Sequence, residues 1–325
     1  MRFRSSPEQL IEEAERALAE LDFRKARRVA AQLLRMRHTA GFEYEARALW
    51  EMGDAEGAIN TLQQGLQVAP TLWILWEYLG HYLSDLARYP EAIDAFRQGL
   101  ACEGAPRDSF LLNLAIVYQR MGDDDTALQM LEQALAALQA VPRAYLECSR
   151  AYSLIRLQRY TEAERALSVA EQTASEANPD LQETIYGMVA AFKGLIAWQR
   201  NNDLARAQQY AEQALWHDKT NPDAIHLMRA GNPIADRPTP LWHILVEGVW
   251  HEPVEGLQMP IGYFANYWVI AETPEEALEY IRPFEPPASR PTLRVAEATI
   301  EATVQGERKG VVRTLGNYLF FSESE

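Results

Sequence analysis

The side chains with the most chemical potential lie near residue 250. Two imidazoles and three carboxylates occur close together in the sequence: His243, Glu247, His251, Glu252 and Glu255. Such groups can bind a metal ion or move protons in acid–base catalysis. On a strand, however, His243 and Glu247 share a face with His251 only if the strand runs unbroken across Gly248. The spacing matches no catalytic motif, so we interpret the group as a polar strand edge followed by a loop.

Other signatures of chemistry are missing from the sequence. It contains no P-loop, no GxGxxG, no GxSxG and no HExxH. Its two cysteines, Cys102 and Cys148, have no CxxC spacing, which argues against a zinc site or a disulfide scaffold. We therefore expect no enzyme, no cofactor and no metal site. A catalytic site near His243 and His251 remains the less favoured alternative.

The charge of the chain restricts its partners. The 325 residues carry a formal net charge of −15. Nucleic acid and anionic membranes bind through basic patches, so neither is an expected partner. A partner with a basic segment fits better, although an acidic surface also serves solubility alone. No apolar stretch is long enough to span a membrane, and the first residues lack the apolar core of a signal peptide. We expect a cytoplasmic protein of unknown oligomeric state.

Evenly spaced alanines indicate how the first two-thirds of the chain is organised. The marker residues are Ala26, Ala58, Ala92, Ala127, Ala163 and Ala207. A small residue at this spacing fits the crossing of two helices, where the backbones approach closely. Turn signals precede several of them, with Gly53, Gly122 and Asn202 favouring a left-handed backbone. Before Ala92, Tyr89–Glu91 is predicted to take the place of such a turn, with Pro90 at a first helical position.

The third repeat carries the clearest motif. It reads W-x-x-L-G-x-x-L and then A-x-x-x-F: Trp76, Leu79, Gly80, Leu83, Ala92 and Phe96. This run resembles a tetratricopeptide repeat (TPR), a helix pair of about 34 residues. The resemblance implies an all-α, superhelical TPR-like array of about six repeats over residues 1–228. The first and sixth repeats match least well, as expected of repeats that end a stack.

The same resemblance implies where a partner binds. In TPR proteins the first helix of each repeat lines a concave groove that holds a peptide or protein. The groove candidates are Tyr44, Arg47, Trp50, Glu77, Tyr78, His81, Asn113, Arg120, Tyr152, Arg156, Lys193 and Arg200. Acidic and aromatic residues predominate in the first half and cations in the second, so the field would orient a peptide. The alternative is that these charges serve solubility and that the aromatics are partly core.

A different pattern begins after residue 228. Residues 229–240 contain the turn-type runs Ala230–Pro233 and Asp236–Pro240, which indicate a linker. Residues 241–325 predict a small α+β domain, an antiparallel sheet with one helix. Its expected elements are strands Leu241–Trp250 and Tyr263–Ala271, helix Glu275–Ile281, a half-buried strand Leu293–Val304 and a fourth strand within Val311–Phe321. The domain resembles no family, and we expect it to cover the apolar helix Leu204–Leu215.

These patterns together predict a protein-interaction scaffold or adaptor. A regulatory sensor that couples the array to the C-terminal domain is the alternative. The identity of the partner and the occupancy of the groove by the chain's own tail stay open.

Overall fold

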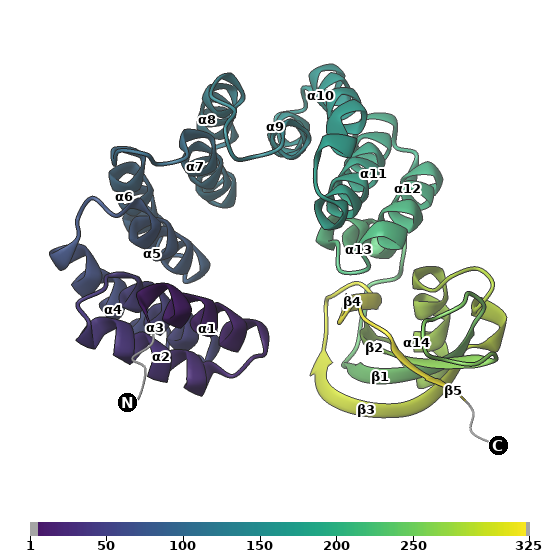
Figure 1. Cartoon of the computed structure of the whole chain (residues 1–325). Helices are drawn as coiled ribbons and strands as arrows, with labels where there is room; N and C mark the ends of the chain where they lie inside the picture. The colour runs from purple at the N-terminus through teal and green to yellow at the C-terminus, as the bar shows by residue number, and fades with distance from the viewer. Residues whose placement is uncertain (1–5, 323–325) are drawn as a thin grey trace. The chain divides into compact units, whose positions relative to one another are not determined.

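The computed structural model describes residues 6–322, and Figure 1 shows the order of its elements. Contacts divide the chain into two compact units, Met1–Val141 and Pro142–Glu325. We call them the N-terminal and C-terminal units and describe each by itself. The predicted boundaries of the array, linker and C-terminal domain stay a prediction.

The N-terminal unit consists of helix pairs. Its helices are α1 (Pro7–Ala19), α2 (Phe23–Arg35), α3 (Ala40–Glu51), α4 (Ala55–Val68), α5 (Trp73–Asp85), α6 (Tyr89–Leu100), α7 (Arg107–Met121) and α8 (Asp124–Ala136). Leu79 and Leu83 of α5 pack with Phe96 of α6 in a core that continues into the neighbouring repeats. Gly80 lies against the ring of Phe96, where a larger residue would not fit. The motif of the third repeat is therefore explained by the packing of α5 against α6.

The C-terminal unit begins with helix pairs and ends with a sheet. Its helices are α9 (Arg143–Arg156), α10 (Tyr160–Thr173), α11 (Pro179–Asn201), α12 (Leu204–His217), α13 (Pro222–Arg229) and α14 (Pro274–Ile281). A short 3₁₀ segment, Ala174–Glu176, precedes the long α11. These residues explain why Ala163 and Ala207 lie farther apart than the other neighbouring marker alanines.

The marker alanines confirm the predicted helix crossings. All six alanines lie in the second helix of their pair and have 0% exposure: Ala26, Ala58, Ala92, Ala127, Ala163 and Ala207. The predicted fold class is thus confirmed, an array of helix pairs followed by an antiparallel sheet.

Five residues before each marker alanine, the backbone turns with positive φ. The turn residues are Leu21 (57°), Gly53 (83°), Ala87 (56°), Gly122 (84°), Gln158 (58°) and Asn202 (53°). This left-handed conformation ends the first helix of each pair, although only two of the positions hold glycine. The prediction that Pro90 takes a first helical position is confirmed, because it lies in the first turn of α6. The prediction that Tyr89–Glu91 makes the third turn is wrong, because Ala87 makes it.

The residue after each turn begins the second helix in one of two ways. In four repeats an aspartate caps the helix by accepting a hydrogen bond from a backbone N–H: Asp22, Asp54, Asp123 and Asp203. In the other two, Arg88 and Arg159 stand at this place. Each donates two hydrogen bonds to a glutamate in the first helical turn, Glu91 and Glu162 respectively. The atypical first and sixth repeats therefore use the same connection as the others.

The sheet is antiparallel throughout. Its strands are β1 (Thr239–Trp250), β2 (Ile261–Ile270), β3 (Arg294–Val304), β4 (Gly310–Thr314) and β5 (Leu319–Ser322). The order is β3-β1-β2-β4, and β5 also pairs with β2. Helix α14 packs against β1 to β4 (Figure 1), and α13 packs against β4. The predicted strands Leu241–Trp250 and Tyr263–Ala271 and the helix Glu275–Ile281 are confirmed within a few residues at their ends.

Other details of the predicted sheet are wrong. Strand β3 is exposed on both faces rather than half-buried, and Ile300 is 53% exposed. The reason is that β3 lies at the edge of the sheet and pairs only with β1. The predicted fourth strand is two strands, because the chain bends between them at Gly316, whose φ is +76°.

The connection between helices and sheet is held in place. Ala235 is buried and donates its N–H to the Glu307 carbonyl, and the side chains of Arg229 and Asn232 donate to the Arg308 and Lys309 carbonyls. The last helix before the sheet is α13, not the predicted Leu204–Leu215. Among the helices that precede the sheet in the chain, α13 therefore makes the main contact with it.

Candidate functional site

The first helices of the N-terminal unit form one continuous surface. Helix α3 contacts α1 and α5, and α5 contacts α7. At the centre of this surface, Arg47 Nη1 of α3 lies 3.0 Å from Glu15 Oε1 of α1 and 3.2 Å from Glu43 Oε1. The Tyr44 hydroxyl donates a hydrogen bond to the same Glu15 oxygen. The Arg47 guanidinium also lies 5.5 Å from the ring centroids of Tyr44 and Tyr78.

A cavity of about 510 Å³ adjoins Arg47. Its walls come from α1, the turn after α1, the start of α2, α3 and α5: Glu15, Leu18, Ala19, Leu21, Phe23, Arg47, Trp50, Glu51, Tyr78 and Tyr82. Trp50 stacks on Tyr82, with ring centroids 4.2 Å apart. We call it the Trp50 cavity. It combines a rigid aromatic floor with charged groups at its rim, as ligand sites commonly do.

Farther along the surface, polar side chains of α5 and α7 bond to one another. Glu77 accepts hydrogen bonds from Ser109 and Asn113, and the Asn113 amide nitrogen lies 3.3 Å from His81 Nε2. Burial lowers the pKa of His81, although Glu77 and Asp85 oppose this effect. Arg120 pairs with Asp85, with Nη1 and Oδ1 2.9 Å apart. The imidazole is therefore a member of a polar network between α5 and α7.

The surface has more carboxylates than cations. Arg47 and Arg120 both have acidic partners. Glu12 and Glu51 form no ion pair with any residue in 6–322, and Glu77 is bonded only to the neutral Ser109 and Asn113. Burial raises the pKa of Glu43, an effect that Arg47 partly offsets. The electrostatic potential of the surface is therefore negative overall.

Comparison with known proteins agrees with this architecture. A tetratricopeptide-repeat family model matches residues 111–145. The Cut9 and Hcn1 hetero-tetramer of the APC/C contains a chain of similar structure, with 15% identity over 68% of this chain and 42% of that one, and a TM-score of 0.52. The chain contains tetratricopeptide repeats. Two further TPR-containing matches have lower scores. PilF of Pseudomonas aeruginosa has 15% identity over 63% of this chain and 88% of its own, with a TM-score of 0.49. The C-terminal part of a TPR protein from Cytophaga hutchinsonii has 16% identity over 70% and 89%, with a TM-score of 0.48. No curated protein matches the chain.

The groove candidates of the C-terminal unit have different surroundings from those of the first four TPRs. Tyr152 contacts Phe192 and lies under the Arg156 guanidinium. Lys193 and Arg200 form ion pairs with Glu171 and Glu164 of α10, the second helix of the preceding repeat. The structure thus brings Tyr44, Arg47, Trp50 and Tyr78 together, and Glu77, His81 and Asn113 together. The predicted change of charge along the whole TPR groove spans both units and stays a prediction.

The histidines near residue 250 do not form one site. Strand β1 runs unbroken across Gly248, but His243 stacks on Trp268 and its Nε2 lies 2.9 Å from Asn266 Oδ1. Glu247 forms an ion pair with Arg294 instead. His251 and Glu252 follow the strand and line a separate cavity. Within the described residues no group of three potential ligands could hold a metal ion.

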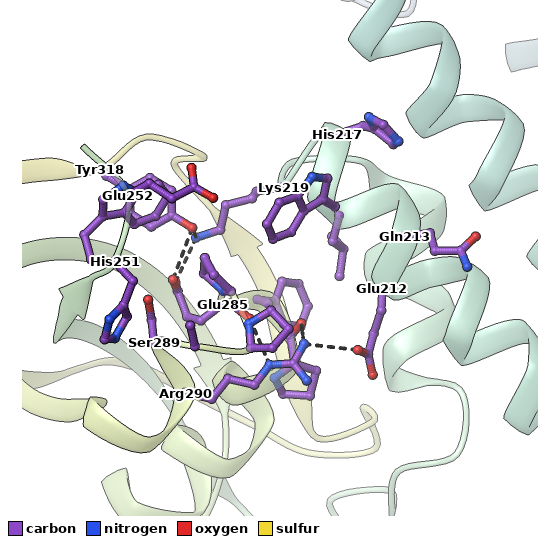
Figure 2. A pocket seen from close by; sticks show the side chains of 18 of the residues that line it. Glu212, Gln213, His217, Lys219, His251, Glu252, Glu285, Ser289, Arg290 and Tyr318 are labelled. Atoms are coloured by element: carbon purple, nitrogen blue, oxygen red, sulfur yellow. Dashed lines mark hydrogen bonds and ion pairs between the residues drawn. The ribbon is translucent and has the colours of Figure 1, made fainter. Parts of the chain in front are cut away.

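That second cavity was not foreseen from the sequence. It has a volume of about 850 Å³ and lies within the C-terminal unit, between α12 and the segment Pro283–Arg290 (Figure 2). At its base, Lys219 Nζ lies 2.8 Å from Glu285 Oε1 and 2.9 Å from the Tyr318 hydroxyl. The lysine follows α12, and the glutamate follows the short 3₁₀ turn after α14. We name it the Trp216 cavity after the tryptophan on its helical wall.

The base of the Trp216 cavity is a fully bonded charge cluster. The Glu285 side chain has 0% exposure and the Lys219 side chain 9%. Glu285 accepts hydrogen bonds from Lys219 and from the hydroxyls of Tyr263, Tyr267 and Tyr318. The ammonium lies 4.0 Å from the Tyr318 ring centroid. Burial lowers the pKa of Lys219, whereas Glu285 opposes that shift.

Proposed function

We propose that the protein is an interaction scaffold whose N-terminal unit binds an extended, basic segment of a partner protein. The segment would lie across α1, α3, α5 and α7 and place an apolar side chain in the Trp50 cavity. The observation that carries this proposal is the Trp50 cavity itself, an aromatic pocket on the surface of first helices that TPR proteins use for binding. Assembly with other proteins is also indicated for the similar chain in the Cut9–Hcn1 hetero-tetramer.

The charge of the surface supports a basic ligand. Arg47 is held by Glu15 and Glu43, so its charge is already compensated. Glu12 and Glu51 carry charge with no cation beside them among the described residues, and Glu51 lines the Trp50 cavity. A ligand with Lys or Arg next to an apolar residue would satisfy both the carboxylates and the pocket. Such exposed charges mainly increase the rate and selectivity of association.

Short labelled peptides test this proposal directly. Fluorescence anisotropy of the full chain should show binding of a peptide with an apolar residue between lysines, and no binding when glutamates replace the lysines. High salt should weaken the binding, because the contacts are exposed. The double variant Glu12→Gln with Glu51→Gln should bind roughly two- to tenfold more weakly, the range expected for two exposed ion pairs.

A matched control separates local contacts from net charge. Glu103 is another exposed glutamate of the N-terminal unit, in the connection between α6 and α7. Glu103→Gln should leave the affinity unchanged. Equal loss per charge removed in Glu103→Gln and in the double variant would mean that only total charge matters, and the groove proposal would then fail.

One observation favours the alternative, a sensor that couples helices to the sheet. Within the C-terminal unit, α13 packs on β4, and Lys219 links the end of α12 to Glu285. Hydrogen exchange of β4 with and without bound peptide tests this coupling. Unchanged exchange at saturation would exclude it. Within residues 6–322 no helix is both long and apolar enough to cross a membrane. We place the scaffold in the cytoplasm as part of this proposal.

A further inference from the structure

The Trp216 cavity has walls suited to a ligand that the N-terminal groove does not explain. One wall comes from α12 and contains Glu212, Gln213 and Trp216. The opposite walls come from the end of β1, the proline-rich turn after α14, and Tyr318 between β4 and β5. Figure 2 shows these segments facing one another across the cavity. A volume of about 850 Å³ is within the usual range of ligand pockets.

Trp216 is the most unusual residue of this cavity. It is 63% exposed, and no other aromatic residue among 6–322 is exposed beyond about a third of its surface. Across the cavity, Trp250 packs on Tyr318 with ring centroids 4.9 Å apart. Aromatic side chains that converge on a cavity provide flat apolar surfaces at a low cost in conformational entropy. The cavity therefore offers rings to a ligand rather than an aliphatic slot.

The free polar groups of the walls include several hydrogen-bond donors. The indole N–H groups of Trp216 and Trp250 and the side-chain amides of Gln209 and Gln213 form no hydrogen bond within the described part of the chain. Arg290, by contrast, is already occupied by Glu212 and by the Glu285 and Pro283 carbonyls. A fitting ligand presents unpaired carbonyl oxygens next to flat apolar surface. The polyproline II helix does so, because its backbone makes no internal hydrogen bonds.

The base and rim complete the site. The cluster of Lys219, Glu285 and the three tyrosines is satisfied without a ligand, so it holds the base of the cavity rigid. A preformed site reduces the ordering cost of binding. Glu252 lies at the rim, is exposed and has no cationic partner in residues 6–322. It can receive a basic residue at one end of the ligand.

We propose that the Trp216 cavity is a second binding site, which takes a proline-rich segment of a partner protein with a basic residue at one end. Prolines would stack on Trp216 and on the Trp250–Tyr318 pair, while the indole and amide N–H groups donate to the ligand's carbonyls. Grooves lined by aromatic residues recognise polyproline II segments in this way in unrelated folds. The site is separate from the Trp50 cavity, so either proposal can fail alone.

Calorimetric titration of the full chain with an oligoproline peptide ending in arginine tests the site. We expect saturable binding that becomes about tenfold weaker or more in Trp216→Ala, as for an aromatic hot spot. Because Trp216 is exposed, this variant should keep its circular dichroism and melting temperature. Ile300→Ala, which changes an exposed apolar residue on β3, is the matched control and should bind normally. Glu252→Gln should remove the preference for arginine over glutamate at the peptide end.

Three results would overturn the proposal. The first is absence of binding by the oligoproline peptide at millimolar concentration. The second is equal binding of a Gly-Ser peptide with the same terminal arginine, which would show that only charge is recognised. The third is unchanged affinity in Trp216→Ala, which would place the peptide elsewhere on the protein.

Discussion

Removing the carboxylate of Glu285 should destabilise the C-terminal unit strongly. Glu285→Gln keeps the size of the side chain but leaves the Lys219 ammonium buried without a counter-charge. The Lys219 side chain is 9% exposed and its partner 0%, so water cannot replace the lost charge. Breaking a buried pair in this way costs about 3–5 kcal/mol of unfolding free energy. Lys219→Met should cost less, about 1.5–3 kcal/mol, because three tyrosine hydroxyls still donate to Glu285.

A double-mutant cycle gives the decisive number. Lys219→Met combined with Glu285→Gln leaves no charge in the cluster, so its cost should fall below the sum of the single variants by about 1–3 kcal/mol. Urea unfolding monitored by near-UV circular dichroism measures these free energies, and hydrogen exchange of β2 assigns the transition to this unit. Glu164→Gln, which breaks the exposed pair with Arg200 in the same unit, is the control and should unfold like the parent. Additive effects, or a loss below about 1 kcal/mol in Glu285→Gln, would refute the reasoning.

The same cluster should make the unit sensitive to alkali. Burial, with Glu285 nearby, raises the pKa of Tyr263, Tyr267 and Tyr318 above 10.0. The folded state therefore keeps these protons above pH 10, where the unfolded chain releases them, and stability falls as pH rises. Lys219 has the opposite effect on the pH dependence of stability. Burial lowers its pKa from 10.5, so at this residue the unfolded chain binds more protons than the folded chain. Three tyrosines outnumber one lysine, so net stability should decrease above pH 10.

Three further variants test other parts of the fold. Asp108→Asn should cost about 2–3 kcal/mol in urea unfolding, because three charge-assisted hydrogen bonds become neutral. Burial raises the pKa of the Asp108 carboxyl, but backbone hydrogen bonds together lower it by more, so the net pKa lies below 3.8. The parent should therefore lose this stability as pH falls below 3.8, whereas the variant should not. Ala87→Gly should raise stability by about 0.5–1 kcal/mol by relieving a left-handed alanine, whereas Ala101→Gly, at φ −81°, should lower it. Gly80→Ala should lower it by about 1–3 kcal/mol, since the new methyl would strike the Phe96 ring; an unchanged melting curve would contradict the close packing.

The helical repeats were predictable because their signals are local. Each TPR contacts mainly its neighbours, so the spacing of Ala58, Ala92 and Ala127 already contains the geometry of the helix crossings. The turns were predicted only where Gly or Asn occurs. Leu21, Ala87 and Gln158 adopt the same positive φ without any residue preference for it, because packing of the helix pair imposes the conformation.

The sheet was harder to predict because alternation reports only which residues share a face. Ala298 and Ile300 alternate with Thr299 and Glu301 in β3, yet both faces are exposed. Whether a face is covered depends on other elements, and little covers either face of β3, the edge strand that pairs only with β1.

The two cavities also differ in how far the sequence could predict them. Residues of the Trp50 cavity could be proposed from the repeat pattern, since Trp50 and Tyr78 occupy first helices. Lys219 and Glu285 are 66 positions apart and each resembles an ordinary surface residue in the sequence. The packing of the end of α12 against the 3₁₀ turn Arg282–Phe284 brings them together, so no spacing rule could have paired them.

The aspartate at the start of α7 has a consequence for how the protein opens. Asp108 has 0% exposure, and one of its oxygens accepts hydrogen bonds from the consecutive amides of Gln139, Ala140 and Val141, each at 2.8 Å. These hydrogen bonds hold residues 139–141, the end of the N-terminal unit, against the start of α7, the first helix of its last repeat. In repeat proteins, loss of structure spreads from one repeat to the next. Unfolding that begins at Pro142 would therefore stop at these three hydrogen bonds. Residues 6–141 would keep their protection against proteases while the helices after them unfold.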